Sequence, residues 1–372
     1  MKQACKRLFF THGGRLRRLA VLTSVILAAI LFFSGIPVSA EPKAEDTAPE
    51  FGLDCVSAIL MEAQTGRVLY EKNADEPLPP ASVTKIMVTT MLTLIAADRK
   101  LLKFEDKVSR FFPCPNDKSE LTIKHLLTHT MGYGHRSLCE KGNTYDNIQN
   151  YILSLPCDFP VGTKVDYSCP GFILLGKILE KVFGDRLDRL FISLIAAPLG
   201  MESSGYCLNR RDAVNSNLSE AERGLVNDYN CRFLGGVAGN AGLFSNIDDI
   251  TKYMLMLQKH GEPLVSRGTF DQAIMNHTEK MSQSRGLGFL YVDSKYSQTG
   301  RLFPKGSIGH CGHTGQSVFI DLKSNVYVII LSDATVTVEK RYGYNYEKVK
   351  LLREKLHNAV DKDIRVLNKN NS

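Results

Sequence analysis

The chain has 372 residues, of which 44% are hydrophobic and 23% are charged, a composition typical of a packed globular protein. Its formal net charge is +7, but six basic residues and no acidic residue precede residue 41, so the remaining chain carries +7 less six, or +1. This near balance excludes a surface built to neutralise many phosphates, and we expect no nucleic-acid partner.

The first forty residues have the layout of an export signal. Basic residues precede an apolar run at Leu19–Phe33, and the small residues Val38–Ala40 follow it. This order predicts a signal peptide over residues 1–40 and a location outside the cytoplasm. An uncleaved membrane anchor is the alternative, although the run is shorter than the roughly 20 apolar residues that span a bilayer. We expect a linker over 41–54 and one folded domain over 55–372.

Along the domain, a β-hairpin is predicted at 56–63 and 67–71, and a long buried helix at 82–97. Further helices are predicted where apolar residues recur at helical spacing: 123–128, 145–155, 172–183, 187–195 and 248–258. Ser245 with Asp248 resembles a capping box for the last of these. Strands at 316–322 and 326–332 and a helix at 346–360 close the chain. The order predicts one sheet assembled from both termini, beside an inserted helical region.

Eight of the nine cysteines follow the leader. In an oxidising compartment they permit up to four disulfides, whose pairing the spacing does not reveal. No Cys-x-x-Cys spacing predicts a zinc site. His125 and His129 lie four apart on a predicted helix, but no third ligand candidate is apparent, so we favour a structural role for both. We expect neither a metal nor a cofactor.

The most informative stretch is LPPASVTKIM, residues 78–87. Positions i and i+3 share a helix face, so Ser82 and Lys85 can point the same way. A poorly solvated lysine with a lowered pKa could take the serine proton, and a helix N-terminus stabilises an oxyanion. The alternative is an N-cap serine with a solvated lysine. We favour catalysis, because no other serine here has lysine three residues later and the helix is too apolar to solvate Lys85.

Two later stretches complete a pattern: PVGTKVDYSCPGF at 160–172 and GHCGHTG at 309–315. With them, the sequence resembles the penicillin-recognising serine hydrolases. Residues 57–87 are similar to low-molecular-mass D-alanyl-D-alanine carboxypeptidases. From about Lys103 onward the chain resembles the class C β-lactamase family, which also holds esterases and D-amino-acid peptidases. The ordered set covers nearly all of the chain after the leader.

The resemblance implies an α+β fold with a helical part packed on an antiparallel sheet, and a mechanism through an acyl-enzyme. It implies that Ser82 is the nucleophile, Lys85 its partner and Tyr167, the tyrosine of the family's Y-x-N element, the proton relay to the leaving group. The substrate-binding third element is matched by His313, Thr314 and Gly315. The backbone N–H groups of Ser82 and Gln316 would form the oxyanion hole.

Two departures from the family pattern bear on the substrate. The third element usually begins with lysine, and His313, mostly neutral near neutral pH, would bind a substrate carboxylate less well. Cys169 stands at the position of the Y-x-N asparagine, and a thiol is a poorer hydrogen-bonding group than an amide. Both changes weaken the case for efficient β-lactam hydrolysis. We also hypothesise that Cys169 and Cys311 lie close enough to form a redox-sensitive pair, against the alternative of two packed thiols.

We expect an exported serine hydrolase, most simply a D-Ala-D-Ala carboxypeptidase-like peptidase acting on peptidoglycan stem peptides. One alternative is an esterase of the class C β-lactamase family. Another is a catalytically impaired penicillin-binding or wall-binding protein, which Cys169 in the Y-x-N element suggests. The expected partner is a peptidoglycan peptide or a small ester or amide. We expect a monomer with peripheral association with the membrane or cell wall.

Overall fold

The computed structural model of the protein describes residues 56–62, 67–72, 79–206, 224–293, 298–332, 343, 345–355 and 357–358, and only the backbone within 56–72. These residues belong to the domain that the sequence predicts over 55–372. The predicted signal peptide at 1–40 and linker at 41–54 lie outside the described residues and stay predictions.

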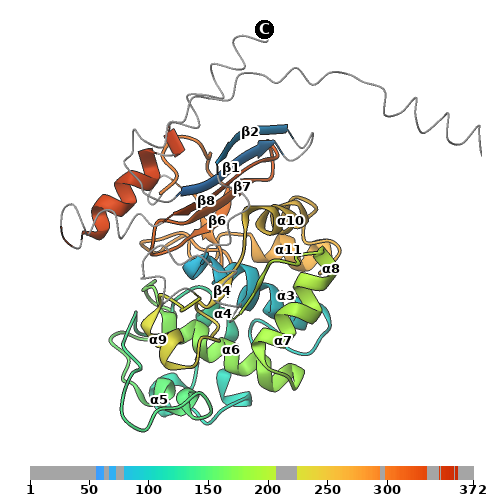
Figure 1. Ribbon diagram of the computed structural model, residues 1–372. Helices are drawn as coiled ribbons and strands as arrows, with labels where there is room; N and C mark the ends of the chain where they lie inside the picture. The colour runs from blue at the N-terminus through green and yellow to red at the C-terminus, as the bar shows by residue number, and fades with distance from the viewer. Residues whose placement is uncertain are drawn as a thin grey trace, which may run out of the picture. The chain divides into compact units, whose positions relative to one another are not determined.

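Strands from the two ends of the domain pair in one antiparallel sheet of six strands, in the order β2-β1-β8-β7-β6-β5 (Figure 1). These strands are β1 (Val56–Glu62), β2 (Arg67–Lys72), β5 (Leu290–Tyr291), β6 (Ile308–Cys311), β7 (Ser317–Asp321) and β8 (Val326–Ser332). β1 runs along β8, with Val56 opposite Ser332. This pairing confirms the predicted α+β fold with a sheet assembled from both termini.

The β7–β8 hairpin shows how local sequence builds the sheet. Tyr327 to Leu331 are all buried, and such a nearly continuous apolar run is typical of an inner strand covered on both faces. A turn joins the two strands, and Asn325 in it has φ 58°. Asparagine tolerates this left-handed conformation better than most residues, which suits it to the turn.

The helices lie between β2 and β5 in the chain and form a region beside the sheet (Figure 1). They are η1 (Ala81–Val83), η2 (Lys85–Thr90), α3 (Met91–Asp98), η3 (Val108–Arg110), η4 (Asn116–Lys118), α4 (Ile123–Leu127), α5 (Ile148–Ser154), α6 (Cys169–Phe183), α7 (Leu187–Phe191), η5 (Ile192–Ala196), α8 (Ala197–Leu199), α9 (Tyr229–Phe233), α10 (Ile247–Gln258) and α11 (Arg267–Ala273). Within this region β3 (Gly205–Tyr206) pairs with β4 (Leu243–Phe244). Residues 346–355 form the helix that the sequence predicts from Tyr346.

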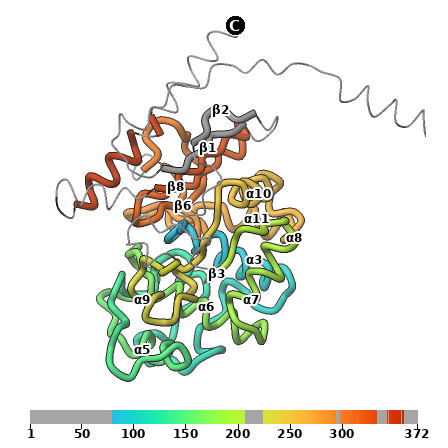
Figure 2. Tube along the Cα trace, viewed as in Figure 1, coloured from blue at the N-terminus to red at the C-terminus, as the bar shows by residue number. Residues whose placement is uncertain are grey.

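The predicted helix at 82–97 is the centre of the core. It is continuous but changes type, from the 3₁₀ turn η1 to the π-helical η2 to the regular α3. Every residue from Val83 to Ala96 is buried. Ala81–Asp98 is long and apolar enough to cross a membrane, but 78% of it is buried inside the protein, as expected of a core helix. η1 contacts β6, where the blue start of the coloured trace meets the sheet in Figure 2.

The start of α10 differs from the prediction. Asn246 is the N-cap, because its side-chain oxygen accepts a hydrogen bond from Asp249 N at 2.9 Å. Ser245 instead pairs with the hydroxyl of Ser204 at 2.7 Å. The predicted capping box of Ser245 and Asp248 is therefore wrong, since the residue directly before the helix is itself a strong N-cap.

Candidate active site

Ser82 and Lys85 face each other at the start of the central helix. Lys85 Nζ donates a hydrogen bond to Ser82 Oγ at 3.2 Å. The contact follows from local geometry, because residues three apart eclipse one another around a 3₁₀ turn. Ala81, directly before the serine, has φ 49°, a left-handed conformation that a bulky or β-branched residue would strain further. The structure thus brings Ser82 and Lys85 together, as their spacing predicts.

Tyr167 reaches this pair from the loop before α6. The hydroxyl of Ser168 caps α6 by accepting from Gly171 N at 3.2 Å, which fixes where the chain enters the helix. The Tyr167 ring centroid lies 4.9 Å from Lys85 Nζ, and Lys85 and Ser82 both act to lower the pKa of its phenol. Burial, opposed by the charge of Lys85, raises the pKa of Tyr167 to about 12, so the phenol is protonated at neutral pH.

Lys85 is fully buried and has three contacts for its amine. Besides Ser82, Nζ donates to Asn240 O at 2.9 Å and to Cys169 Sγ at 3.6 Å. Burial acts to lower the pKa of Lys85, but interaction with the acidic groups of Cys169 and Tyr167 outweighs it, so that the pKa is raised. The lowered pKa expected from the sequence is wrong, because the sequence did not reveal these charge partners.

Cys169 and Cys311 have different surroundings. Burial acts to raise the pKa of Cys169, but the charge of Lys85 and a hydrogen bond with His135 bring it below its ordinary value. Burial raises the pKa of Cys311, whose neighbours include Arg353 and Ser317. Both cysteines are buried and free, and the redox-sensitive pair stays a prediction. All six described cysteines are free: Cys114, Cys139, Cys157, Cys169, Cys231 and Cys311.

The predicted third element forms the turn between β6 and β7. His313 is exposed and stacks on Tyr346, with ring centroids 5.0 Å apart. Thr314 is buried, and its hydroxyl accepts from Gln316 Nε2. Gly315 has φ +108°, which favours glycine in this turn.

Gln316 Nε2 also donates to Pro79 O at 2.9 Å, so its side chain ties the turn to the segment that leads to Ser82. The turn is thereby held beside the nucleophile. That the backbone N–H of Gln316 binds an oxyanion stays a prediction.

Two histidines that the sequence analysis did not select for the site flank Tyr167. The ring centroid of His129 lies 4.6 Å from that of Tyr167, and the ring centroid of His310 lies 6.2 Å from it. Both are buried, and burial with nearby positive charge holds their pKa values well below the ordinary range, so both imidazoles are neutral. The signal for His310 was present, because His310-Cys311-Gly312 is a second His-x-Gly directly before the one that was selected.

The loop that holds Lys85 from the other side depends on Gly239. A Cβ on this glycine would stand 2.1 Å from Phe172 O, and Gly239 O accepts from the hydroxyl of Thr89 at 2.7 Å. Gly239→Ala is therefore expected to lower the free energy of unfolding by about 1–3 kcal/mol and to reduce activity, because Asn240 O must move away from Lys85. Urea denaturation and an ester assay measure the two effects. An alanine variant with unchanged stability would contradict this packing.

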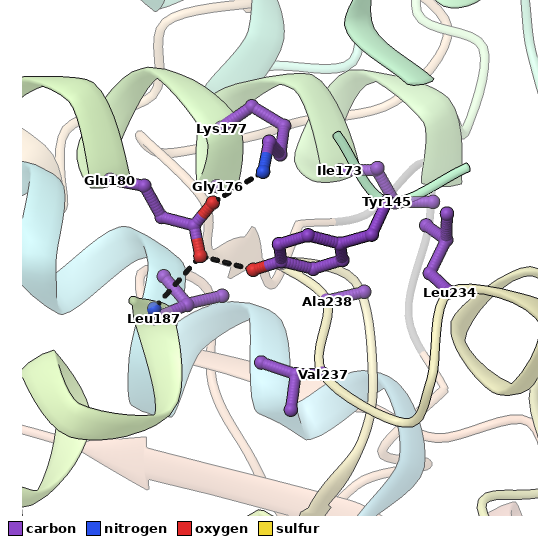
Figure 3. A pocket seen from close by; sticks show the side chains of 10 residues that line it. Tyr145, Ile173, Gly176, Lys177, Glu180, Leu187, Leu234, Val237 and Ala238 are labelled. Atoms are coloured by element: carbon purple, nitrogen blue, oxygen red, sulfur yellow. Dashed lines mark hydrogen bonds and ion pairs between the residues drawn. The ribbon is translucent and has the colours of Figure 1, made fainter. Parts of the chain in front are cut away.

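A separate pocket lies beside α6, opposite residues 234–239 (Figure 3). On its wall Glu180 accepts hydrogen bonds from Lys177 Nζ at 2.6 Å, from Leu187 N at 3.0 Å and from the hydroxyl of Tyr145. These polar groups are thus already paired with one another. None of the residues that the sequence predicts for catalysis lines this pocket.

Comparison with known proteins agrees with this arrangement. The family model described as Beta-lactamase matches residues 52–351. A relative from Escherichia coli strain K12 named as a D-alanyl-D-alanine carboxypeptidase is 29% identical over a 300-residue alignment, which covers 68% of this chain and 68% of the relative. Esterase EstB of Burkholderia gladioli is 27% identical over 340 residues, covering 75% of this chain and 86% of the esterase.

Solved structures agree on the fold. EstCE1, described as a hydrolase with promiscuous acyltransferase activity, matches with a TM-score of 0.64 at 19% identity, over 83% of this chain and 95% of that chain. At this identity the likeness speaks for the fold alone.

Proposed function

Since the chain belongs to the Beta-lactamase family of serine hydrolases, we propose that it works through an acyl-enzyme on Ser82 and hydrolyses D-alanine-ending peptides of peptidoglycan. The observation that carries the proposal is the convergence of Ser82, Lys85 and Tyr167 around one amine. We propose further that the protein acts outside the cytoplasm as a monomer, with its leader at 1–40 removed, and associates peripherally with the membrane or cell wall.

The three side chains have complementary tasks in this chemistry. Ser82 Oγ bonds to the substrate carbonyl carbon and gives its proton to the network around Lys85. Tyr167, whose phenol is protonated at neutral pH, donates its proton to the departing amine or alcohol. Water then cleaves the acyl group from Ser82 by the reverse path. The backbone N–H groups of Ser82 and Gln316 would stabilise the oxyanion.

The relative named as a carboxypeptidase supports a peptide substrate. A D-alanine-ending peptide carries a carboxylate, and the buried guanidinium of Arg353 supplies positive charge behind the β6–β7 turn, where it donates to Gly312 O at 2.8 Å. Although His313 in the turn is exposed, its neighbours partly desolvate the ring, which brings its pKa below the ordinary value. A neutral His313 contributes little to carboxylate binding.

The second candidate is an esterase, which the neutral state of His310 and His313 favours. Esters of uncharged alcohols need no cation at the leaving-group side, and the similarity to Esterase EstB supports this alternative. Both candidates use the same acyl-enzyme. They differ only in the leaving group.

The test measures both reactions on one preparation. We expect release of D-alanine from a peptide that ends in D-Ala-D-Ala, together with a covalent acyl adduct on the peptide that contains Ser82, detected by mass spectrometry. Hydrolysis of a p-nitrophenyl ester without release of D-alanine would contradict the peptidase and support the esterase. A binding-only protein would show neither reaction, and Ser82→Ala, which lacks the nucleophile, is the matched control for background hydrolysis.

A further inference from the structure

Lys85 carries a buried positive charge that needs a partner of opposite charge. Its Nζ contacts Asn240 O at 2.9 Å, Ser82 Oγ at 3.2 Å and Cys169 Sγ at 3.6 Å. An ammonium group has three donors, so three acceptors fit the protonated lysine. A backbone carbonyl cannot ionise and an alcohol does not do so near neutral pH, which leaves the thiol of Cys169 as the contact that can balance the charge.

The other titratable groups that face this pair are Tyr167, His135 and Asp228, together with the neutral imidazoles of His129 and His310. Tyr167 keeps its proton, as its pKa of about 12 shows. The carboxylate of Asp228 caps α9 by accepting from Cys231 N at 2.8 Å and acts on the pair only through its charge. Interaction with Cys169 raises the pKa of His135, and the imidazole in turn favours negative charge on the sulfur.

We propose that Cys169 is a thiolate in the resting protein, that it is the counter-ion of Lys85, and that it takes up the proton of Ser82 through Lys85. The inference rests on the proposed acyl-enzyme function and deepens it. Sγ lies on α6 and Nζ on η2, far apart in sequence, so the pair exists only because α6 packs against the central helix. Cys169 acts through Lys85, which makes it a positioning residue.

The proton steps balance without any redox change. As Ser82 Oγ bonds to the carbonyl carbon, its proton moves to Lys85 Nζ, and a proton of Lys85 moves to Cys169 Sγ. Lys85 stays an ammonium group, the thiolate becomes a thiol, and the negative charge appears on the substrate oxygen. When the leaving group departs with the proton of Tyr167, Lys85 reprotonates Tyr167 and the thiol reprotonates Lys85. The thiolate is then restored.

The family that the sequence resembles has asparagine at the position of Cys169. An amide orients Lys85 by hydrogen bonding but can neither carry its counter-charge nor accept a proton. A thiolate does both. In this chain the proton acceptor beside the lysine is therefore a thiolate, where the family pattern has a neutral group.

The first test needs no substrate, so its failure is distinct from failure of the proposed function. A thiolate absorbs ultraviolet light more strongly than a thiol, and the other cysteines are common to the wild type and Cys169→Ser. We expect one extra thiolate in the wild type at neutral pH, lost on acidification and absent from Lys85→Met. Identical absorbance of wild type and Cys169→Ser across this titration would overturn the proposal.

The second test is the pH profile of kcat/KM on the ester or peptide that the protein hydrolyses. Cys169→Asn is expected to lower kcat/KM by about 10²-fold and to remove the fall in rate on the acid side, since that fall reports protonation of the thiolate. Cys169→Asp is expected to recover most of the loss, because a carboxylate supplies the same charge and accepts a proton.

Cys231→Ser is the matched control. Cys231 is also buried, and its Sγ donates to Ala241 O at 3.2 Å, a bond that a serine hydroxyl can replace. Its pH profile is expected to follow the wild type. Circular dichroism establishes that each variant is folded. A folded Cys169→Asn with the rate and pH profile of the wild type, or a folded Cys169→Asp as slow as Cys169→Asn, would contradict the proton-acceptor role.

Discussion

Replacing Lys85 with methionine is expected to lower kcat/KM by about 10³-fold to 10⁴-fold while the protein stays folded, with a loss of about 1–3 kcal/mol of stability. The activity falls because Lys85 contacts both Ser82 Oγ and Cys169 Sγ. The protein stays folded because, although Asn240 O loses its donor, no charge is left unpaired: without the ammonium group, burial returns Cys169 to the neutral thiol. Steady-state kinetics and urea denaturation measure the two effects.

Lys118→Met is the matched control, because Lys118 is also fully buried but lies away from Ser82. Its Nζ donates to Leu155 O at 2.5 Å and pairs with Asp117 at 2.9 Å. Its removal leaves the buried carbonyl unpaired, so we expect this variant to lose about 1–3 kcal/mol of stability and to keep its activity. If Lys85→Met instead unfolds or keeps its rate, the assignment of Lys85 to the chemistry is wrong.

Mild acid is expected to destabilise the protein steeply, because three buried histidines are held neutral: His129, His310 and His357. Burial is the main cause in each, and for His357 it lowers the pKa to about 3. The unfolded chain binds protons near the ordinary pKa of 6.5, whereas the folded protein does not. The contribution of these histidines to the free energy of unfolding is therefore complete when the pH is above that value. It is lost as the pH falls towards their pKa values in the folded protein.

Each histidine lowers the free energy of unfolding by up to about 1.4 kcal/mol per pH unit in this window, and the three together by about 4 kcal/mol per unit. Urea denaturation followed by circular dichroism from about pH 7 to about pH 5 measures the slope. His357→Gln, which can still bond to the hydroxyl of Ser317, is expected to reduce the slope by about one third. A free energy of unfolding that stays level over this range would show that the imidazoles are not buried as described.

The sequence predicted the parts of the site that local spacing controls. Ser82 and Lys85 lie on one turn, so their contact needed no knowledge of the fold. Tyr167 comes from far along the chain, and its place beside them was predicted only through the resemblance to a family with an ordered set of motifs. The sheet assembled from both termini was predicted from the strand patterns at each end of the domain.

Other features depend on packing that the sequence did not reveal. The two adjacent His-x-Gly patterns look alike, and only the register in which Cys311 of β6 opposes Ser317 of β7 puts His310 beside Tyr167 and His313 in the turn. His129 lies against Tyr167 because Ser168 N donates to its Nδ1 at 3.1 Å. The raised pKa of Lys85 requires Cys169, which lies 84 residues away in the chain.

Because β1 pairs with β8, the sheet can form only late in synthesis of the chain. Contacts between distant segments slow folding, and the first strand of this domain finds its inner neighbour only after nearly the whole chain has been made. A nascent chain that ends before β8 leaves the backbone edges of β1 and β7 exposed, which promotes aggregation. Deletion of β8 should therefore give insoluble protein rather than a smaller working enzyme, and expression trials with C-terminal truncations would show a sharp loss of solubility at this strand.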